Sequence, residues 1–257
     1  MCIRDRFNDS WIGEAPPAGH IINLNHTMEI TRLNETGYVR MGCDGDAVIF
    51  DCGSCGPDDN PGHAHADFLA IEVSVGGNRF LVDPAVPTYT EGALRDFARS
   101  ASSHNGPHLK GVEPVEFWKS FRVGRRGRAK EITSKTLSGV APLWCAGFHD
   151  GYAHVGVKTW RFVGLWPNQA MIICDLIEGG ALFPMFSNFL VPECWDKVEN
   201  DDLSFRLNDK EVIDLHAALE LRWRDLKGPG TLLLKEGSII ISSTETPSPE
   251  IAAAFRA

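Results

Sequence analysis

The chain has 257 residues and a formal net charge of −9. This length is enough to bury a large core, in one large β domain or in two small domains. The negative charge argues against general nucleic-acid binding, because affinity for polyphosphates comes mostly from lysine and arginine. No run of apolar residues in the sequence approaches the length that a membrane-spanning helix needs.

The two ends of the chain differ in character from its middle. Residues 1–6 resemble a translated sequencing adapter, so we expect the true start of the protein to lie upstream. Residues 7–27 are polar and rich in turn residues, as expected for a linker or the remnant of an upstream region. We predict one β domain over residues 28–245, followed by a tail over residues 246–257. No secretory signal is visible after Met1, and with an upstream start this leaves the compartment open.

Short apolar or alternating stretches in the first part of the chain predict β-strands. These stretches are residues 29–33, 37–41, 47–50, 68–75 and 78–82. Gly76 and Gly77 separate the last two and predict a two-residue hairpin turn. Residues 90–103 are the best helix candidate, and they would present Arg95 and Arg99 one helical turn apart.

The second part of the chain continues the same pattern. Its predicted strands are residues 121–123, 152–157, 159–163, 169–177, 203–207, 212–215, 219–223, 231–235 and 238–242. Many short strands with frequent turn signals predict an all-β fold, a large multi-stranded antiparallel β-sandwich with one short helix.

The sequence Gly62-His-Ala-His-Ala-Asp67 is the strongest functional signal. On an extended strand, His63 and His65 would point to the same face, because side chains alternate with a period of two. The predicted hairpin would bring His65 near Asp83, and His104 adds a third group of the kind that zinc binds. A single buried histidine is more often a core residue than a ligand, but this combination predicts a metal site.

Two further patterns have simpler interpretations. The sequence contains seven cysteines, and Cys52 and Cys55 have the spacing of a thiolate pair. No second pair follows, so we interpret them as part of a turn. The basic stretch 122–130 could face a polyanion, but a solvated strand and turn is the favoured interpretation.

Several phrases in order along the chain resemble the C-terminal β domain of the heparinase II/III-type polysaccharide lyases. The resemblance is good over residues 45–180 and looser elsewhere. The phrases that carry it are Phe50-Asp-Cys-Gly53, Gly62-His-Ala-His-Ala-Asp67, Phe80-Leu-Val-Asp-Pro84, Pro87-Thr-Tyr-Thr-Glu-Gly92, Arg95-Asp-Phe-Ala-Arg-Ser100, Ser103-His-Asn105, Val115-Glu-Phe-Trp118 and Phe121-Arg-Val-Gly124.

The resemblance implies a site and a reaction. It implies a structural Zn²⁺ held by His65, Asp83 and His104, with His63 facing a cleft and Tyr89 near the active site. The cleft of this family binds an acidic polysaccharide between the β domain and an N-terminal α/α toroid, which this chain lacks. Cleavage by β-elimination, and a periplasmic or secreted location, are further implications. We expect the fragment alone to be inactive.

Three more residues are candidates for substrate binding. Arg95 and Arg99 could bind carboxylate or sulfate groups bidentately, although exposed helix arginines without a ligand are equally compatible with the pattern. Asn105 could contact substrate or cap a turn.

Two other functions compete with a lyase. A cupin-like metal enzyme also carries two histidines in this spacing on a β-sandwich, but it needs a glutamate soon after them, and Glu72 lies too far along. A non-catalytic glycan-binding or structural module is the other alternative.

Overall fold

The computed structural model describes residues 28–43, 45–83, 86–132, 141–167, 170–179 and 185–191, together with four strands further along the chain. These strands are β14 (Asp196–Lys197), β15 (Ser204–Leu207), β16 (Glu211–Ala218) and β17 (Ser238–Ser242). The strands predicted at 219–223 and 231–235, the predicted linker and the predicted tail all lie outside the described residues.

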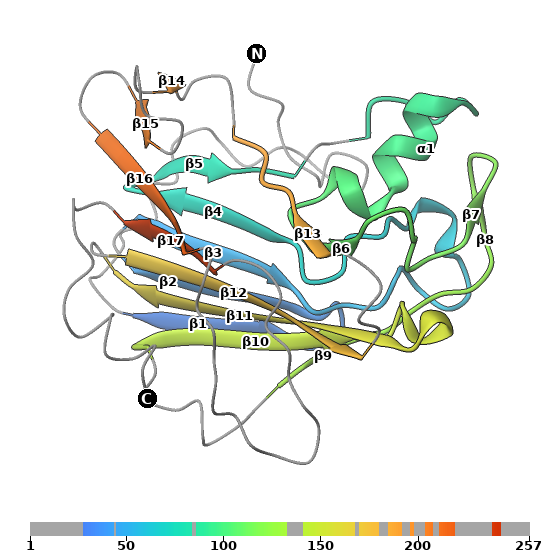
Figure 1. Cartoon of the computed structure of the whole chain (residues 1–257), viewed down its shortest axis with the longest axis horizontal. Coiled ribbons are helices and arrows are strands. Elements are labelled where there is room, and N and C mark those ends of the chain that lie inside the picture. Colours follow the sequence, from blue (N-terminus) through green and yellow to red (C-terminus); the bar gives the residue numbers. More distant parts are fainter. Residues whose placement is uncertain are drawn as a thin grey trace, which may run out of the picture.

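The first sheet is an antiparallel meander in chain order (Figure 1). Its strands are β1 (Glu29–Leu33), β2 (Tyr38–Cys43), β3 (Asp46–Asp51), β4 (Ile71–Val75) and β5 (Asn78–Leu81). The hairpin between β4 and β5 has Val75 opposite Asn78, and its two loop residues, Gly76 and Gly77, have φ of 55° and 84°. Positive φ at both positions is what a type I′ turn requires, so the predicted glycine turn is confirmed.

The second sheet is larger and also antiparallel throughout. Its strand order is β14-β15-β16-β17-β12-β11-β10-β9. The strands from its β9 edge inward are β9 (Ala129–Glu131), β10 (Leu143–His149), β11 (Val157–Trp166) and β12 (Ala170–Gly179).

One hydrophobic core joins the two sheets. Alternate residues of β2 and β3 are buried in it, and so are alternate residues of β10, β11 and β12: Val39, Met41, Val48, Phe50, Leu143, Cys145, Val163, Leu165, Met171 and Ile173. Because each strand contributes every second side chain, the two sheets pack face to face as a β-sandwich. The predicted all-β sandwich is confirmed.

Short elements gather at one end of the sandwich (Figure 1). They are the 3₁₀ turn η1 (Pro61–His63), helix α1 (Ala93–Arg99), the 3₁₀ turn η2 (Ala101–Ser103) and the hairpin of β7 (Phe117–Trp118) and β8 (Arg122–Val123). Nearby, β6 (Pro107–Leu109) pairs with β13 (Met185–Ser187). The helix predicted over 90–103 is therefore real but shorter.

The strand predicted at 152–157 is wrong. Residues Ala153–Val155 form the 3₁₀ turn η4, and Gly156 follows with φ of 72°, so β11 starts only at Val157. Tyr152 looks like a strand residue, but its hydroxyl accepts a hydrogen bond from the backbone N–H of Leu109 and anchors the turn instead.

A buried ion pair lies between β11 and β12. Arg161 and Asp175 face each other in the strand register and form two parallel hydrogen bonds of 2.6 Å. The same guanidinium donates to the carbonyl oxygens of Leu69 and Asn105. Leu69 has φ of 58°, a conformation that side chains rarely adopt, and this hydrogen bond helps to hold it there. The pair thus connects the sheet to the two segments that carry the histidines.

Candidate functional site

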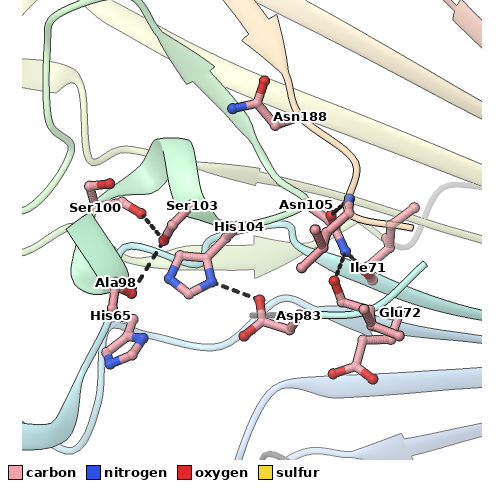
Figure 2. Close-up of polar contacts among 12 residues, drawn as sticks. His65, Ile71, Glu72, Asp83, Ala98, Ser100, Ser103, His104, Asn105 and Asn188 are labelled. Atoms are coloured by element: carbon pink, nitrogen blue, oxygen red, sulfur yellow. Dashed lines mark hydrogen bonds and ion pairs between the residues drawn. The ribbon is translucent and has the colours of Figure 1, made fainter. Parts of the chain in front are cut away.

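The three residues predicted as metal ligands converge in the structure (Figure 2). The Nδ1 of His104 donates to the Oδ1 of Asp83 at 2.7 Å, and these side chains are 0% and 5% exposed. The ring centroids of His65 and His104 lie 5.3 Å apart. His65 follows η1, Asp83 follows β5 and His104 follows η2, so three separate segments supply this cluster.

Burial sets the charge state of the cluster. Desolvation lowers the pKa of His65 to about 4, with His104 and Arg95 acting in the same direction and Asp67 and Asp83 opposing them. His65 is therefore a neutral imidazole at neutral pH, the form that binds metal ions. The Nη1 of Arg95 lies 3.2 Å from the Nε2 of His65, so this nitrogen accepts a hydrogen bond from the guanidinium.

The donor set suits zinc chemically, but the arrangement is not that of a closed metal site. With Zn–N bonds of about 2.0–2.1 Å, two imidazole rings on one tetrahedral ion have centroids about 5 Å apart, which the 5.3 Å separation matches. Within the described part of the chain, however, no group of three or more His, Cys, Asp and Glu side chains is placed to hold a metal ion. For all three residues to bind one ion, the Nε2 of His65 would have to exchange Arg95 for the metal, and the hydrogen bond between His104 and Asp83 would have to open.

His63 lies in different surroundings from His65. Its exposed ring lies 5.4 Å from the ring of Tyr89, edge to face, and 5.6 Å from the ring of Phe121. Tyr89 stacks on Phe121 at 5.8 Å. The structure thus brings the two predicted catalytic residues together at the surface. Phe121, the shared neighbour of both, was predicted only as part of a strand and of the phrase Phe121-Arg-Val-Gly124, not as a site residue.

The expectation that His63 and His65 share one face of a strand is wrong. Residues Pro61–His63 form the 3₁₀ turn, and Ala64 leaves it in an extended conformation with φ −65° and ψ 149°. The proline at the start of η1 favours the turn over a strand. As a result one histidine faces solvent and the other faces the interior.

Arg95 connects the buried cluster to the surface pair. Besides its contact with His65, its guanidinium lies 5.1 Å from the centroid of the Tyr89 ring. The side chain is 0% exposed.

Arg95, Arg99 and Asn105 do not occupy the positions expected for substrate-binding residues. The arginines are 0% and 1% exposed, and both donate to backbone carbonyls of the β7–β8 turn. Asn105 is 1% exposed and donates to the carbonyls of Ile71 and Val82 (Figure 2). These side chains hold loops in place from the interior of the domain. In this conformation a polysaccharide cannot reach them.

The two cysteines of the CxxC pattern are buried free thiols. Burial raises the pKa of Cys55 to about 12 and raises the pKa of Cys52 further. Both are therefore protonated at neutral pH, whereas metal binding and thiol exchange need the thiolate. Cys55 instead contacts the carbonyl oxygen of His65 at 3.4 Å.

The remaining sequence patterns have structural roles. Arg126 and Arg128 of the basic stretch form ion pairs with Asp58. Glu72, the glutamate that a cupin-like site would need, pairs with Arg79 at 2.7 Å. Among the described residues, no helix has the length and apolar character to cross a bilayer.

Comparison with solved structures identifies the fold. A heparan sulfate lyase HepC mutant from Pedobacter heparinus matches with a TM-score of 0.57 and 15% identity, over 91% of this chain and 35% of that chain. A heparinase III structure matches with a TM-score of 0.54 and 16% identity, over 87% of this chain and 35% of that one. The chain thus spans about a third of the length of these proteins. No curated protein matches it.

The family model described as "Heparinase II/III-like, C-terminal" matches residues 25–248. That range contains both sheets, the buried cluster of His65, Asp83 and His104, and the surface pair of His63 and Tyr89. The chain therefore belongs to the heparinase II/III-like C-terminal family.

Proposed function

We propose that this chain is the β domain of a polysaccharide lyase that cleaves uronate-containing acidic glycans by β-elimination. The observation that carries the proposal is the pairing of His63 with Tyr89 at the surface, where Arg95 links Tyr89 to the buried His65–Asp83–His104 cluster. Similarity to the structures of a heparan sulfate lyase and of heparinase III supports the substrate class. Export to the periplasm or medium is part of the proposal.

The chemistry explains why these residue types suit the site. In β-elimination the C–H bond α to the uronate carboxylate breaks, a carbon–carbon double bond forms, and the bond to the leaving oxygen on the β carbon breaks. The α proton is weakly acidic, so neutralising the carboxylate lowers the barrier. In this proposal His63 hydrogen-bonds the carboxylate and Tyr89 transfers protons. An upstream domain absent from this chain would supply the rest of the machinery.

Zinc has a structural role in this proposal. His65, Asp83 and His104 would hold the ion, which would cross-link the three loops that carry them and so position His63. The chemistry assigned to this chain in the reaction stays with His63 and Tyr89.

The complete gene product, with its upstream region restored, tests the function. We expect it to release unsaturated uronate products, seen as a rise in ultraviolet absorbance, from at least one acidic polysaccharide among heparan sulfate, chondroitin, hyaluronan and alginate. The present chain alone should give no product. Silence of the complete protein on every polymer would favour the non-catalytic glycan-binding module, an alternative that the exposed aromatic side chains beside His63 support.

Removal of one proposed ligand tests the metal site. His65→Ala should abolish the stoichiometric zinc that we expect in the purified protein, because a three-residue site loses a required donor. Elemental analysis after dialysis measures this, and the matched variant His63→Ala should keep its zinc. Equal zinc content in wild type and His65→Ala would contradict the ligand assignment.

A further inference from the structure

Two exposed aromatic side chains lie on the β7–β8 hairpin, and one of them, Phe121, is next to His63. Trp118 is 44% exposed and Phe121 is 49% exposed. The Phe121 ring contacts the rings of both His63 and Tyr89. A Cβ added to Gly62 would lie 3.5 Å from the Cβ of Phe121, so the hairpin also packs closely on the segment that carries His63.

Buried arginines hold this hairpin turn in place. Arg95 donates from Nε and Nη2 to the carbonyl of Ser120, both at 3.2 Å. Arg99 donates to the carbonyls of Lys119 and Ser120 at 3.3 and 3.2 Å. Its Nε also donates to the carbonyl of Ala64 at 3.1 Å, between the two histidines.

This bracing has a consequence for binding. Lys119 has φ of 53°, a conformation that is costly for a side-chain-bearing residue unless its surroundings hold it. A turn fixed by several charged donors loses little conformational entropy when a ligand docks on it. The aromatic rings are therefore presented to solvent on a preorganised support.

The charge around the turn favours an anionic ligand. Lys119 and Arg122 are exposed at the turn, and Arg95 and Arg99 add two buried positive charges beneath it. There are two acidic neighbours: Glu116, which accepts a hydrogen bond from the backbone N–H of Arg125 at 3.2 Å, and Asp96, which interacts electrostatically with Arg99. This local excess of positive charge contrasts with the net charge of −9 of the whole chain.

We propose that Phe121 forms an aromatic subsite that binds one pyranose ring of an acidic oligosaccharide. The apolar C–H face of the sugar stacks on the Phe121 ring, and its carboxylate or sulfate faces the basic turn. This deepens the proposed function, on which it rests for the placement of neighbouring sugars at His63 and Tyr89.

Calorimetric titration of the 257-residue chain with heparan sulfate and chondroitin tetrasaccharides tests the subsite. We expect binding of at least one of them and no binding of neutral maltotetraose. Phe121→Ala should weaken binding by about tenfold or more, because the apolar stacking surface of the Phe121 ring is lost. Phe121→Trp should retain the binding, because it keeps an aromatic ring at this position. Phe186→Ala is the matched control, since Phe186 is 42% exposed on β13 and should leave affinity unchanged.

Three results would overturn the subsite: no binding of any acidic tetrasaccharide by the unaltered chain, equal effects of Phe121→Ala and Phe186→Ala, or a Phe121→Ala variant of the complete protein that melts at lower temperature with unchanged affinity. The third result would show that Phe121 packs against another domain of the complete protein and does not bind sugar. Binding that depends on Phe121 in a complete protein without lyase activity would support the subsite and refute the proposed reaction. If the complete protein is an active lyase, and Phe121→Ala changes neither its activity nor its oligosaccharide affinity, the proposed reaction is supported and the subsite is refuted.

Discussion

Replacing His63 by alanine is expected to reduce the turnover of the complete lyase by about 10²- to 10³-fold, the range typical for loss of one hydrogen-bond donor to developing charge. The exposed ring of His63 has Tyr89 and Phe121 as neighbours, so its removal leaves no buried cavity. Initial rates of unsaturated uronate formation measure kcat and KM, and the melting temperature should stay within a few degrees of wild type.

A second histidine offers a matched control for this variant. His154 lies in η4 at another exposed position, with its Nδ1 3.2 Å from the carbonyl of Gly151. His154→Ala should keep the wild-type kcat. If His63→Ala also retained full turnover, His63 would have no part in the reaction, and the proposed division of roles would be wrong.

The largest expected effect on stability comes from the buried ion pair. Asp175→Asn should lower the free energy of unfolding by about 3 kcal/mol or more, because it leaves the charge of Arg161 buried without a full counter-charge. Arg161 and Asp175 are 0% and 3% exposed, so water cannot compensate. Urea denaturation followed by tryptophan fluorescence measures the change.

The same strand supplies the control for this measurement. Glu178→Gln makes the same chemical change on β12, but Glu178 pairs with Lys158 at 3.8 Å with both side chains about 40% exposed. Surface pairs of this kind contribute about 0–1 kcal/mol. Similar losses for the two variants would show that burial does not determine the contribution of the Arg161–Asp175 pair.

Local patterns predicted much of the fold. Strands β1 and β17 have the bounds expected from their apolar residues, and the Gly76-Gly77 turn forms as its backbone preferences require. Strand β10 was missed. Its interior Gly147 breaks the alternation of apolar side chains, yet a Cβ there would lie 2.3 Å from the Sγ of Cys52, so only glycine fits against the opposite sheet.

The positions of the candidate site residues could be predicted where residue types form a recognisable pattern. They could not be predicted where they depend on backbone groups far away in the sequence. The convergence of His65, Asp83 and His104 and the contact of His63 with Tyr89 follow the resemblance to the family. The burial of Arg95 and Arg99 could not be read from a helix pattern, because the carbonyls that bind them belong to a turn some 20 residues further along. The sequence around each arginine therefore does not indicate that its hydrogen-bond partners lie in the β7–β8 turn.

The fork shape of the two α1 guanidinium groups makes positions 95 and 99 selective beyond their charge. Arg99 reaches Ala64 through Nε and the hairpin turn through Nη1, directions that diverge from one planar group. A lysine ammonium at the end of a flexible stem cannot serve both at once. Among homologous chains, arginine at both positions should therefore indicate that the β7–β8 turn packs against the segment of His63 and His65 as it does here. A lysine at either position should indicate a different placement of this turn.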